Sequence, residues 1–227
     1  MLHKPALLGI LGAIIGLEGY KEKGKFPEYY EKLKDLKIGV EPLNHEKGNF
    51  QKTVIKYSNT VGYANNGSTY LTEEATLIKP AYRIYLLLEF DNENHKQLYG
   101  YLKEGKTEYI PYFGKNEFPI WWDKDEFLEY DFKKIEQPDN SFRISTIFNI
   151  NEEKLPVVDF KQEESARRRD KTLEAPYIYF ERLPSCFDEK LFQYQLDKFV
   201  YSNYLFKKEL LVHNLYLLEN QNYVQFH

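Results

Sequence analysis

The sequence predicts an α+β fold in which strands outnumber helices. Only a few segments, among them residues 4–17 and 94–104, carry apolar residues at the spacing of a helix. Most of the other ordered segments are short runs of Tyr, Phe, Val and Ile bounded by turn residues, as is typical of strands. Aromatic residues make up 17% of the chain, and they favour strands.

The bulk composition bounds the class of protein. With 227 residues, 42% of them hydrophobic and 29% charged, the chain is expected to form one large globular domain or two small ones. The net charge of −4 argues against a free-standing protein that binds duplex nucleic acid, because such proteins carry a basic excess. The single cysteine, Cys186, leaves no internal disulfide, so a cytoplasmic location is expected.

An apolar stretch, HKPALLGILGAIIGLEGY, opens the chain at residues 3–20. Its twelve central apolar residues would span roughly 18 Å as a helix, which is short of the roughly 30 Å membrane core. No small-x-small cleavage site follows, so we interpret the stretch as a buried helix with Pro5 in its first turn. Gly9, Gly12 and Gly16 are expected to share one face, where a strand or a ligand backbone would pack closely.

A short helix over residues 27–36 and strands over 37–43 and 50–60 are expected to follow. Residues 63–76 contain the sequence NNGS at 65–68, which is a strong hairpin turn signal. The flanks of this turn are polar and weakly patterned, so the hairpin is expected to project from the body of the protein.

The rest of the chain continues the mixture of strands and helices. Residues 79–90 include the continuous apolar run IYLLLEF, which predicts a central strand. An amphipathic helix over 94–104, ended by Gly105, is followed by an aromatic-rich strand and loop over 107–122. The last third is expected to hold strands over 142–148, 177–183, 210–218 and 223–226, a helix over 188–199, and an exposed loop or partly disordered insert over 152–175.

No constellation of residues predicts catalysis, a metal site or a bound cofactor. Residues 100–107 match the P-loop pattern, but a helix leads into them and a strand-like stretch follows, which reverses the order that this loop requires. The five histidines are scattered, and none lies at metal-ligand spacing from another. Acid–base cleavage of RNA by dispersed Tyr, Lys or His side chains stays open.

Two basic segments are candidates for RNA contacts. In IPYFGKNEF, residues 110–118, Lys115 could reach a phosphate and Asn116 a base edge, although the segment also fits an ordinary turn. Arg167, Arg168 and Arg169 form a run of positive charge suited to phosphates, but their acidic neighbours make a solvated loop equally compatible.

Several segments, taken in order, resemble one known family: HKPALLGILGAIIGLEGY, IKPAYRIYLLLEF, YFGKNEF, YFERLP and YQLDKFVYSN. Together they are similar to the CRISPR-associated RAMP-superfamily subunit that holds the crRNA 5′ handle in type I effector (Cascade) complexes, most of all in the type I-B branch. The resemblance implies a ferredoxin-like, RRM-type domain over residues 1–135 and a smaller β-rich lobe over 136–227. The hairpin, at about residues 62–77, would be the thumb that inserts between backbone subunits and kinks the crRNA.

The resemblance also implies a function. The chain would be a non-catalytic subunit that caps one end of the effector filament, in contact with the crRNA, the backbone subunits and the large subunit. Target DNA would be engaged only indirectly, and no membrane would be involved. The residues expected to bind RNA are Lys4, Tyr63, Asn66, Lys115, Asn116, Arg167, Arg168 and Arg169.

Two other functions are compatible with the same resemblance. Members of the family carry a further strand ahead of the first helix, and this sequence has no counterpart of it. The second hypothesis is therefore a shortened homologue, carried by a phage or mobile element, that assembles into the complex and inactivates it as an anti-CRISPR mimic. The third hypothesis is a crRNA-processing endoribonuclease that works without a metal ion.

Overall fold

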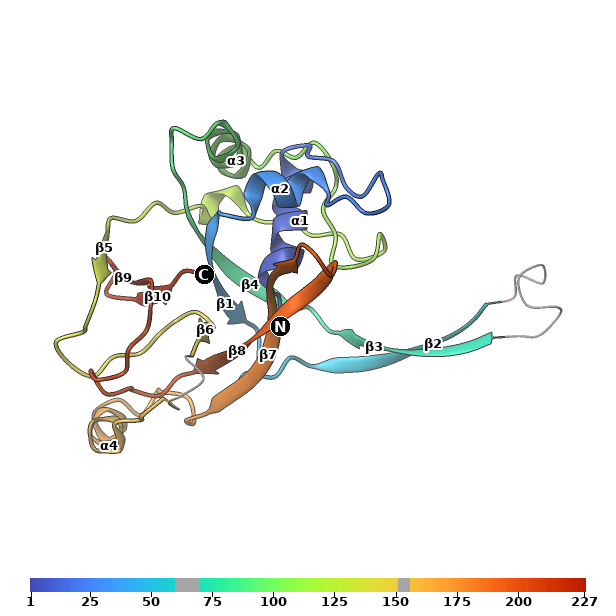
Figure 1. Cartoon of the computed structure of the whole chain (residues 1–227). Coiled ribbons are helices and arrows are strands. Elements are labelled where there is room, and N and C mark those ends of the chain that lie inside the picture. The colour runs from blue at the N-terminus through green and yellow to red at the C-terminus, as the bar shows by residue number, and fades with distance from the viewer. Residues whose placement is uncertain (60–69, 151–155) are drawn as a thin grey trace.

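The computed structural model describes residues 1–59, 70–150 and 156–227, which form a mixed α+β fold with small antiparallel sheets, as the sequence predicts (Figure 1). Its helices are α1 (Lys4–Ile14), α2 (Glu28–Leu33), α3 (Glu93–Glu104) and α4 (Phe160–Arg169), with a 3-10 turn η1 (Lys124–Glu126). Its strands are β1 (Lys37–Leu43), β2 (Lys52–Asn59), β3 (Tyr70–Leu77), β4 (Ala81–Leu87), β5 (Phe132–Ile135), β6 (Phe148–Asn149), β7 (Ile178–Asp188), β8 (Gln193–Ser202), β9 (Leu215–Leu218) and β10 (Tyr223–Gln225). The sheet orders β1-β4, β2-β3, β10-β9-β5 and β6-β8-β7 do not establish the expected ferredoxin-like sheet.

The apolar stretch at the start of the chain forms α1, and local chemistry explains where it begins and ends. The imidazole of His3 accepts a hydrogen bond from the Ala6 amide at 3.3 Å, and Pro5 lies in the first turn. Gly16 lies beyond the helix with a φ of 79°, in the left-handed region that favours glycine. It is therefore absent from the glycine face that its spacing predicts.

The remaining glycines of α1 face α2 and not a strand or a ligand. A Cβ built on Gly12 would lie 2.3 Å from the Cβ of Tyr29, whereas one built on Gly9 would lie 3.6 Å from the Tyr29 ring. The close approach predicted from the glycines is therefore present at Gly12. The predicted neighbour was wrong, because a tyrosine side chain of α2 occupies that position.

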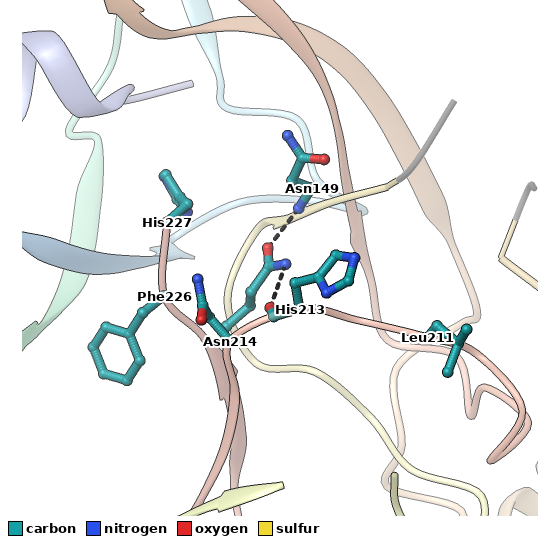
Figure 2. A pocket seen from close by; sticks show the side chains of 7 residues that line it. Asn149, Leu211, His213, Asn214, Phe226 and His227 are labelled. Atoms are coloured by element: carbon teal, nitrogen blue, oxygen red, sulfur yellow. Dashed lines mark hydrogen bonds between the residues drawn. The ribbon is translucent and has the colours of Figure 1, made fainter. Parts of the chain in front are cut away.

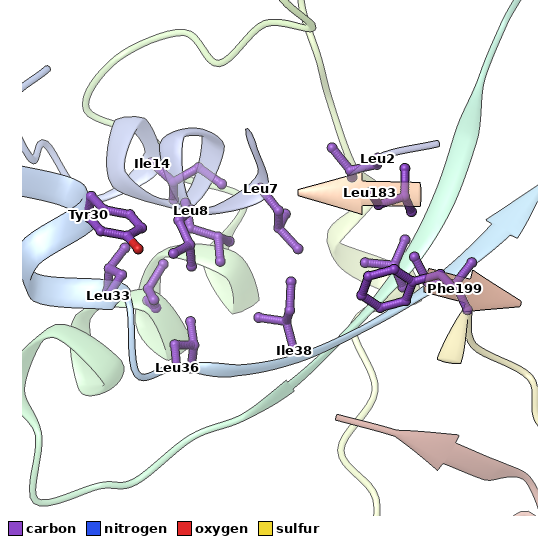
Figure 3. Close-up of a cluster of buried hydrophobic side chains, with 14 of the residues drawn as sticks. Leu2, Leu7, Leu8, Ile14, Tyr30, Leu33, Leu36, Ile38, Leu183 and Phe199 are labelled. Carbon is purple, nitrogen blue, oxygen red and sulfur yellow. The ribbon is translucent and has the colours of Figure 1, made fainter. Parts of the chain in front are cut away.

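β1 and β4 form the sheet on which the N-terminal helices pack. The two strands pair antiparallel over their whole length. Figure 3 shows Leu8 of α1 and Leu36 gathered with Ile38 of β1, and all three side chains are fully or almost fully buried. Each such side chain stabilises the fold by about 1.5–3 kcal/mol relative to an exposed one. The opposite face of the sheet holds Tyr85, which packs in a second cluster with side chains of β9 and β10.

Among the described residues, β4 has a neighbouring strand on one side only. Beyond β1, the backbone of Ile38 exchanges two hydrogen bonds with His227, at 3.2 and 3.0 Å, and Val40 accepts one from Ile147 at 2.8 Å. Beyond β4, the described residues form no backbone hydrogen bond. The prediction of a central strand over residues 79–90 is therefore wrong. The run is apolar because helices cover one of its faces and the C-terminal strands cover the other.

β2 and β3 form a two-stranded ribbon, called the arm below, that extends away from the rest of the molecule (Figure 1). The strands pair antiparallel from Lys52 opposite Leu77 to Asn59 opposite Tyr70. The expected turn at residues 65–68, together with the candidate RNA contacts Tyr63 and Asn66, lies outside the described residues.

The C-terminal part departs from the sequence prediction in two elements. Residues 188–199, expected to be helical, belong to the long hairpin of β7 and β8, because Phe199 and Tyr201 alternate into the core at strand spacing. Residues 152–175, expected to be an exposed loop, include α4. Asp159 caps this helix by accepting a hydrogen bond from the Gln162 amide at 3.1 Å.

Two segments expected to be strands are mostly irregular. Residues 142–148 form isolated bridges at Phe142 and Ile144 and supply only the first residue of the short strand β6. Residues 107–122 form a loop with a bridge between Tyr112 and Pro119. In residues 142–148 the apolar side chains are buried in two different clusters, whereas in residues 107–122 Ile110 and Trp121 are exposed.

Candidate nucleic-acid interface

The loop that carries Lys115 forms a tight turn at the base of the arm. Gly114 takes a φ of 76°, which lets the chain reverse there. The ammonium group of Lys115 bonds the Glu74 carboxylate on β3 and lies 5.4 Å from the ring centroid of Tyr57 on β2. The hydrogen bond to Glu74 raises the pKa of Lys115 above its ordinary value. The turn is thus tied to both strands of the arm.

The two residues of this loop that are candidates for RNA binding, Lys115 and Asn116, differ in their accessibility to a ligand. Lys115 already has an anionic partner, so it reaches a phosphate only by exchanging Glu74 for it. Asn116, the next residue, is exposed, and its side chain makes no hydrogen bond with the described residues. Asn116 is therefore the more accessible of the two to a ligand.

The three arginines of α4 have different surroundings. Arg167 lies 2.5 Å from the carboxylate of Glu163, whose side chain is only 5% exposed. Arg168 pairs with Glu164 at 2.6 Å on the surface, and Arg169 donates to a backbone carbonyl within the helix. Only Arg168 and Arg169 stay at the surface, where an anion could reach them.

Glu163 is the centre of a buried charge cluster that the sequence did not predict. Besides Arg167, it contacts the Arg143 guanidinium at 3.2 Å and accepts a hydrogen bond from the Leu205 amide at 2.8 Å. These contacts join α4 to segments on both sides of it in the sequence. Arg167 therefore stabilises the fold. Glu163 has a structural role as well, because it does more than lower the net positive charge around the arginines.

Lys4 is half-buried and is engaged within the protein. Its ammonium group donates to the His227 carbonyl at 3.1 Å, and burial lowers its pKa. The predicted RNA contacts do not meet in one site: Lys4 lies at the start of α1, Lys115 at the base of the arm, and the arginines on α4 (Figure 1).

A histidine–tyrosine pair fixes the loop that leads from β1 into the arm. His45 accepts a hydrogen bond from the Gly48 amide at its Nδ1, 3.2 Å away, so its Nε2 donates to the Tyr201 hydroxyl at 2.9 Å. Tyr201 in turn donates to the Pro42 carbonyl at 3.2 Å. Burial lowers the pKa of His45 and raises the pKa of Tyr201, so both side chains are neutral at pH 7. This pair holds the base of the arm in place.

A shallow hollow of about 230 Å³ lies at the C-terminal end of the chain and is smaller than the roughly 300–1,000 Å³ of typical small-molecule sites (Figure 2). The Gln225 side chain spans it, accepting from the Asn149 amide at 2.6 Å and donating to the His213 carbonyl at 2.9 Å. Burial lowers the pKa of His227, at its edge, to about 3. Gln225 joins three segments here, and this role is structural.

Apolar side chains exposed on the arm were missed in the sequence. Val54, Ile55, Tyr57 and Leu71 are 57%, 40%, 45% and 77% exposed. Their residue types favoured a strand, but nothing in the pattern indicated that no second layer would cover them. An arm with this surface is a candidate contact for another molecule.

Among the described residues, no three His, Cys, Asp or Glu side chains are placed to hold a metal ion together. Within the same residues, every helix is too short or too polar to cross a bilayer.

The chain matches no family model, and no curated protein is detectably similar to it. The likeness to a CRISPR effector subunit therefore rests on the sequence segments quoted above.

Proposed function

We propose that this chain is a non-catalytic, cytoplasmic subunit of a type I-B-like CRISPR effector complex, where it caps the crRNA 5′ handle. The observation that carries the proposal is the arm, which reaches away from the body and leaves its apolar side chains exposed (Figure 1). The position of the arm along the chain is that of the thumb hairpin in the family that the sequence resembles.

An arm of this kind needs a partner. An isolated two-stranded hairpin is at best marginally stable in water, and exposed strand edges and apolar side chains pair readily with other chains. Val54 and Leu71 lie on the same side of the arm, because the register places Val54 opposite Ala75 and Leu71 opposite Ser58. That side suits insertion between two copies of a repeating subunit.

The RNA would be contacted close to the body of the protein. Asn116 at the base of the arm, and Arg168 and Arg169 on α4, supply accessible polar groups for the crRNA. Lys115 joins them once an RNA phosphate replaces Glu74. Target DNA is then read by pairing with the guide, and not by side chains of this chain.

Co-purification with tagged backbone subunits and crRNA tests the proposal. The chain is expected in the assembled complex, with the 5′ end of the crRNA protected from nuclease. Leu71→Ser is expected to lower incorporation at least about tenfold without changing thermal stability, because this side chain is 77% exposed. Leu128→Ser, at a site 62% exposed and away from the arm, is the matched control that keeps incorporation. A complex that protects the crRNA equally well without this chain would contradict the proposal.

A second function is favoured by the open edge of β4. The resemblance implies a strand beside β4, and none of the described residues supplies one. A subunit altered at this position could assemble and yet leave the complex inactive, as an anti-CRISPR mimic would. Expression in cells with a working type I-B system separates the two: a subunit leaves immunity intact, and a mimic abolishes it.

A further inference from the structure

The outer face of the β7–β8 hairpin carries side chains that none of the interactions above uses. Side chains alternate across a strand, so this face is the one opposite to Leu183 and Phe199, which point into the core. Its members are three cross-strand pairs: Phe180 with Val200, Arg182 with Lys198, and Pro184 with Leu196.

Most of this face is open to solvent. Phe180 is 50% exposed and Leu196 is 44% exposed, and Arg182 and Lys198 between them are also exposed. Val200 alone is fully buried, because an apolar cluster that includes Phe148 and Phe206 covers that end of the hairpin. The face thus offers an aromatic ring, the Arg182 guanidinium group and an aliphatic side chain to a ligand.

Arg182 differs from the other arginines of the chain. Arg83, Arg143, Arg167 and Arg168 each pair with a glutamate, and Arg169 donates to a backbone carbonyl. Across residues 1–59, 70–150 and 156–227, the Arg182 side chain forms no ion pair or hydrogen bond. Lys198 has a further interaction within the chain, so the argument rests on Arg182.

We propose that the outer face of the β7–β8 hairpin binds single-stranded RNA, with Arg182 holding a phosphate and Phe180 stacking on a base. The planar guanidinium group matches a phosphate with two parallel hydrogen bonds. An aromatic ring on an exposed sheet surface is the usual platform for an unpaired base.

The spacing and the charge favour this ligand over others. Phe180 and Arg182 are two residues apart on one strand, which places them about 7 Å apart on the same face. Arg182 has no anionic partner among the described residues, so its charge suits a polyanion. A duplex is disfavoured because the whole chain carries a net charge of −4. The inference rests on the proposed binding of RNA and names the face that performs it.

Fluorescence anisotropy with a labelled ten-nucleotide single-stranded RNA and the full chain tests the inference. Arg182→Glu is expected to weaken binding at least about tenfold, and Phe180→Ala about five- to a hundredfold, because a stacked base contributes about 1–3 kcal/mol. Arg182→Lys is expected to retain part of the affinity. Both sites are exposed, so thermal unfolding is expected to be unchanged in all three variants.

Lys96→Glu, an exposed site on α3, is the matched charge-reversal control and is expected to bind as the wild type does. Equal binding by the wild type and Arg182→Glu would overturn the inference and leave the proposed function standing. Loss of affinity in Lys96→Glu as large as in Arg182→Glu would also overturn it, since binding would then follow net charge alone. No binding of RNA by the wild type would overturn both the inference and the proposed function.

Discussion

Gly12 is the position in α1 where a single methyl group is expected to matter most. Its Cβ would lie 2.3 Å from the Cβ of Tyr29, close to backbone that cannot move freely. Overpacking costs about 1–3 kcal/mol, and a gain of about 1 kcal/mol in helix propensity offsets part of it. Gly12→Ala is therefore expected to lower the free energy of unfolding by up to about 2 kcal/mol in urea titrations. Gly9→Ala, where the contact is 3.6 Å, is the control and should be neutral or stabilising.

Glu163 is the single carboxylate on which the packing of α4 depends most. It is buried, forms ion pairs with Arg143 and Arg167, and accepts a hydrogen bond from the Leu205 amide. Glu163→Gln is expected to cost about 2–4 kcal/mol of unfolding free energy, because it leaves buried guanidinium charge without a counter-ion. Glu164→Gln breaks an exposed pair on the same helix and should cost at most about 1 kcal/mol. Equal effects of the two substitutions would contradict this assignment.

His227 makes the stability of the protein depend on pH. Burial lowers its pKa from 6.5 to about 3, and its Nδ1 has no hydrogen-bond partner in the part of the chain that the structure describes. Below pH 6.5 the unfolded chain therefore binds a proton that the folded chain excludes, so this group lowers stability as the pH falls from about 6.5 towards 3. The slope approaches about 1.4 kcal/mol per pH unit.

The variant His227→Phe is expected to remove that part of the slope. Urea unfolding of the variant and the wild type at pH 7, 6 and 5 measures the difference. The two proteins should diverge progressively below pH 6.5, with the wild type losing more stability. Parallel curves over this range would show that His227 does not titrate on unfolding.

At the level of elements, the open edge of β4 has a direct signature in hydrogen exchange. The backbone of Ile38 points away from β4 towards His227, so the residue opposite it, Leu86, also points outward, and Ile84 follows by alternation. The amides of Tyr85 and Leu87 instead face β1. We expect the outward amides to exchange at least about tenfold faster by NMR. Equal protection of both sets would mean that the edge is covered.

The elements also show where sequence reasoning succeeds. α1 and β1 were predicted within a few residues, because an apolar helix with Pro5 and a short strand are specified by local chemistry. The strand β8 was taken for a helix because the hairpin tip and the start of the strand, residues 191–196, are exposed, so the alternation into the core appears only from Phe199. α4 was missed since its buried face consists of Glu163 and not of apolar residues.

The candidate site was predictable only in part, for a similar reason. Residue type identified Lys115 and Arg167 as cations. Their partners could not be read from it, because Glu74 is brought to Lys115 by the tertiary fold and Glu163 lies one turn from Arg167 on the same face of a helix that was not anticipated. The same limit hid Arg182, which stands out only by comparison with the paired arginines. Charge in a sequence locates candidates, and the register of strands decides which of them remain free.

At the scale of the whole molecule, the two halves of the chain share one core. Ile147, Leu183 and Phe199 pack in the same cluster as Leu8 and Ile38, across the expected boundary at residue 135. The last residues of the chain also bond the edge of β1. Burial shared in this way makes the stability of each half depend on the other.

One cooperative unfolding transition is therefore expected for the whole chain. Hydrogen-exchange mass spectrometry across a urea series should show peptides from α1 and from β8 losing protection at the same urea concentration. Val224→Ala, at a fully buried site between β1–β4 and β9, should shift both transitions equally, by about 1–3 kcal/mol. Two separate transitions, with only the C-terminal one moved by Val224→Ala, would show that the halves fold independently. If the chain unfolds in one transition, loss of a C-terminal contact also destabilises α1. The reason is that α1 packs on the β1–β4 sheet, and the end of the chain bonds the edge of that sheet.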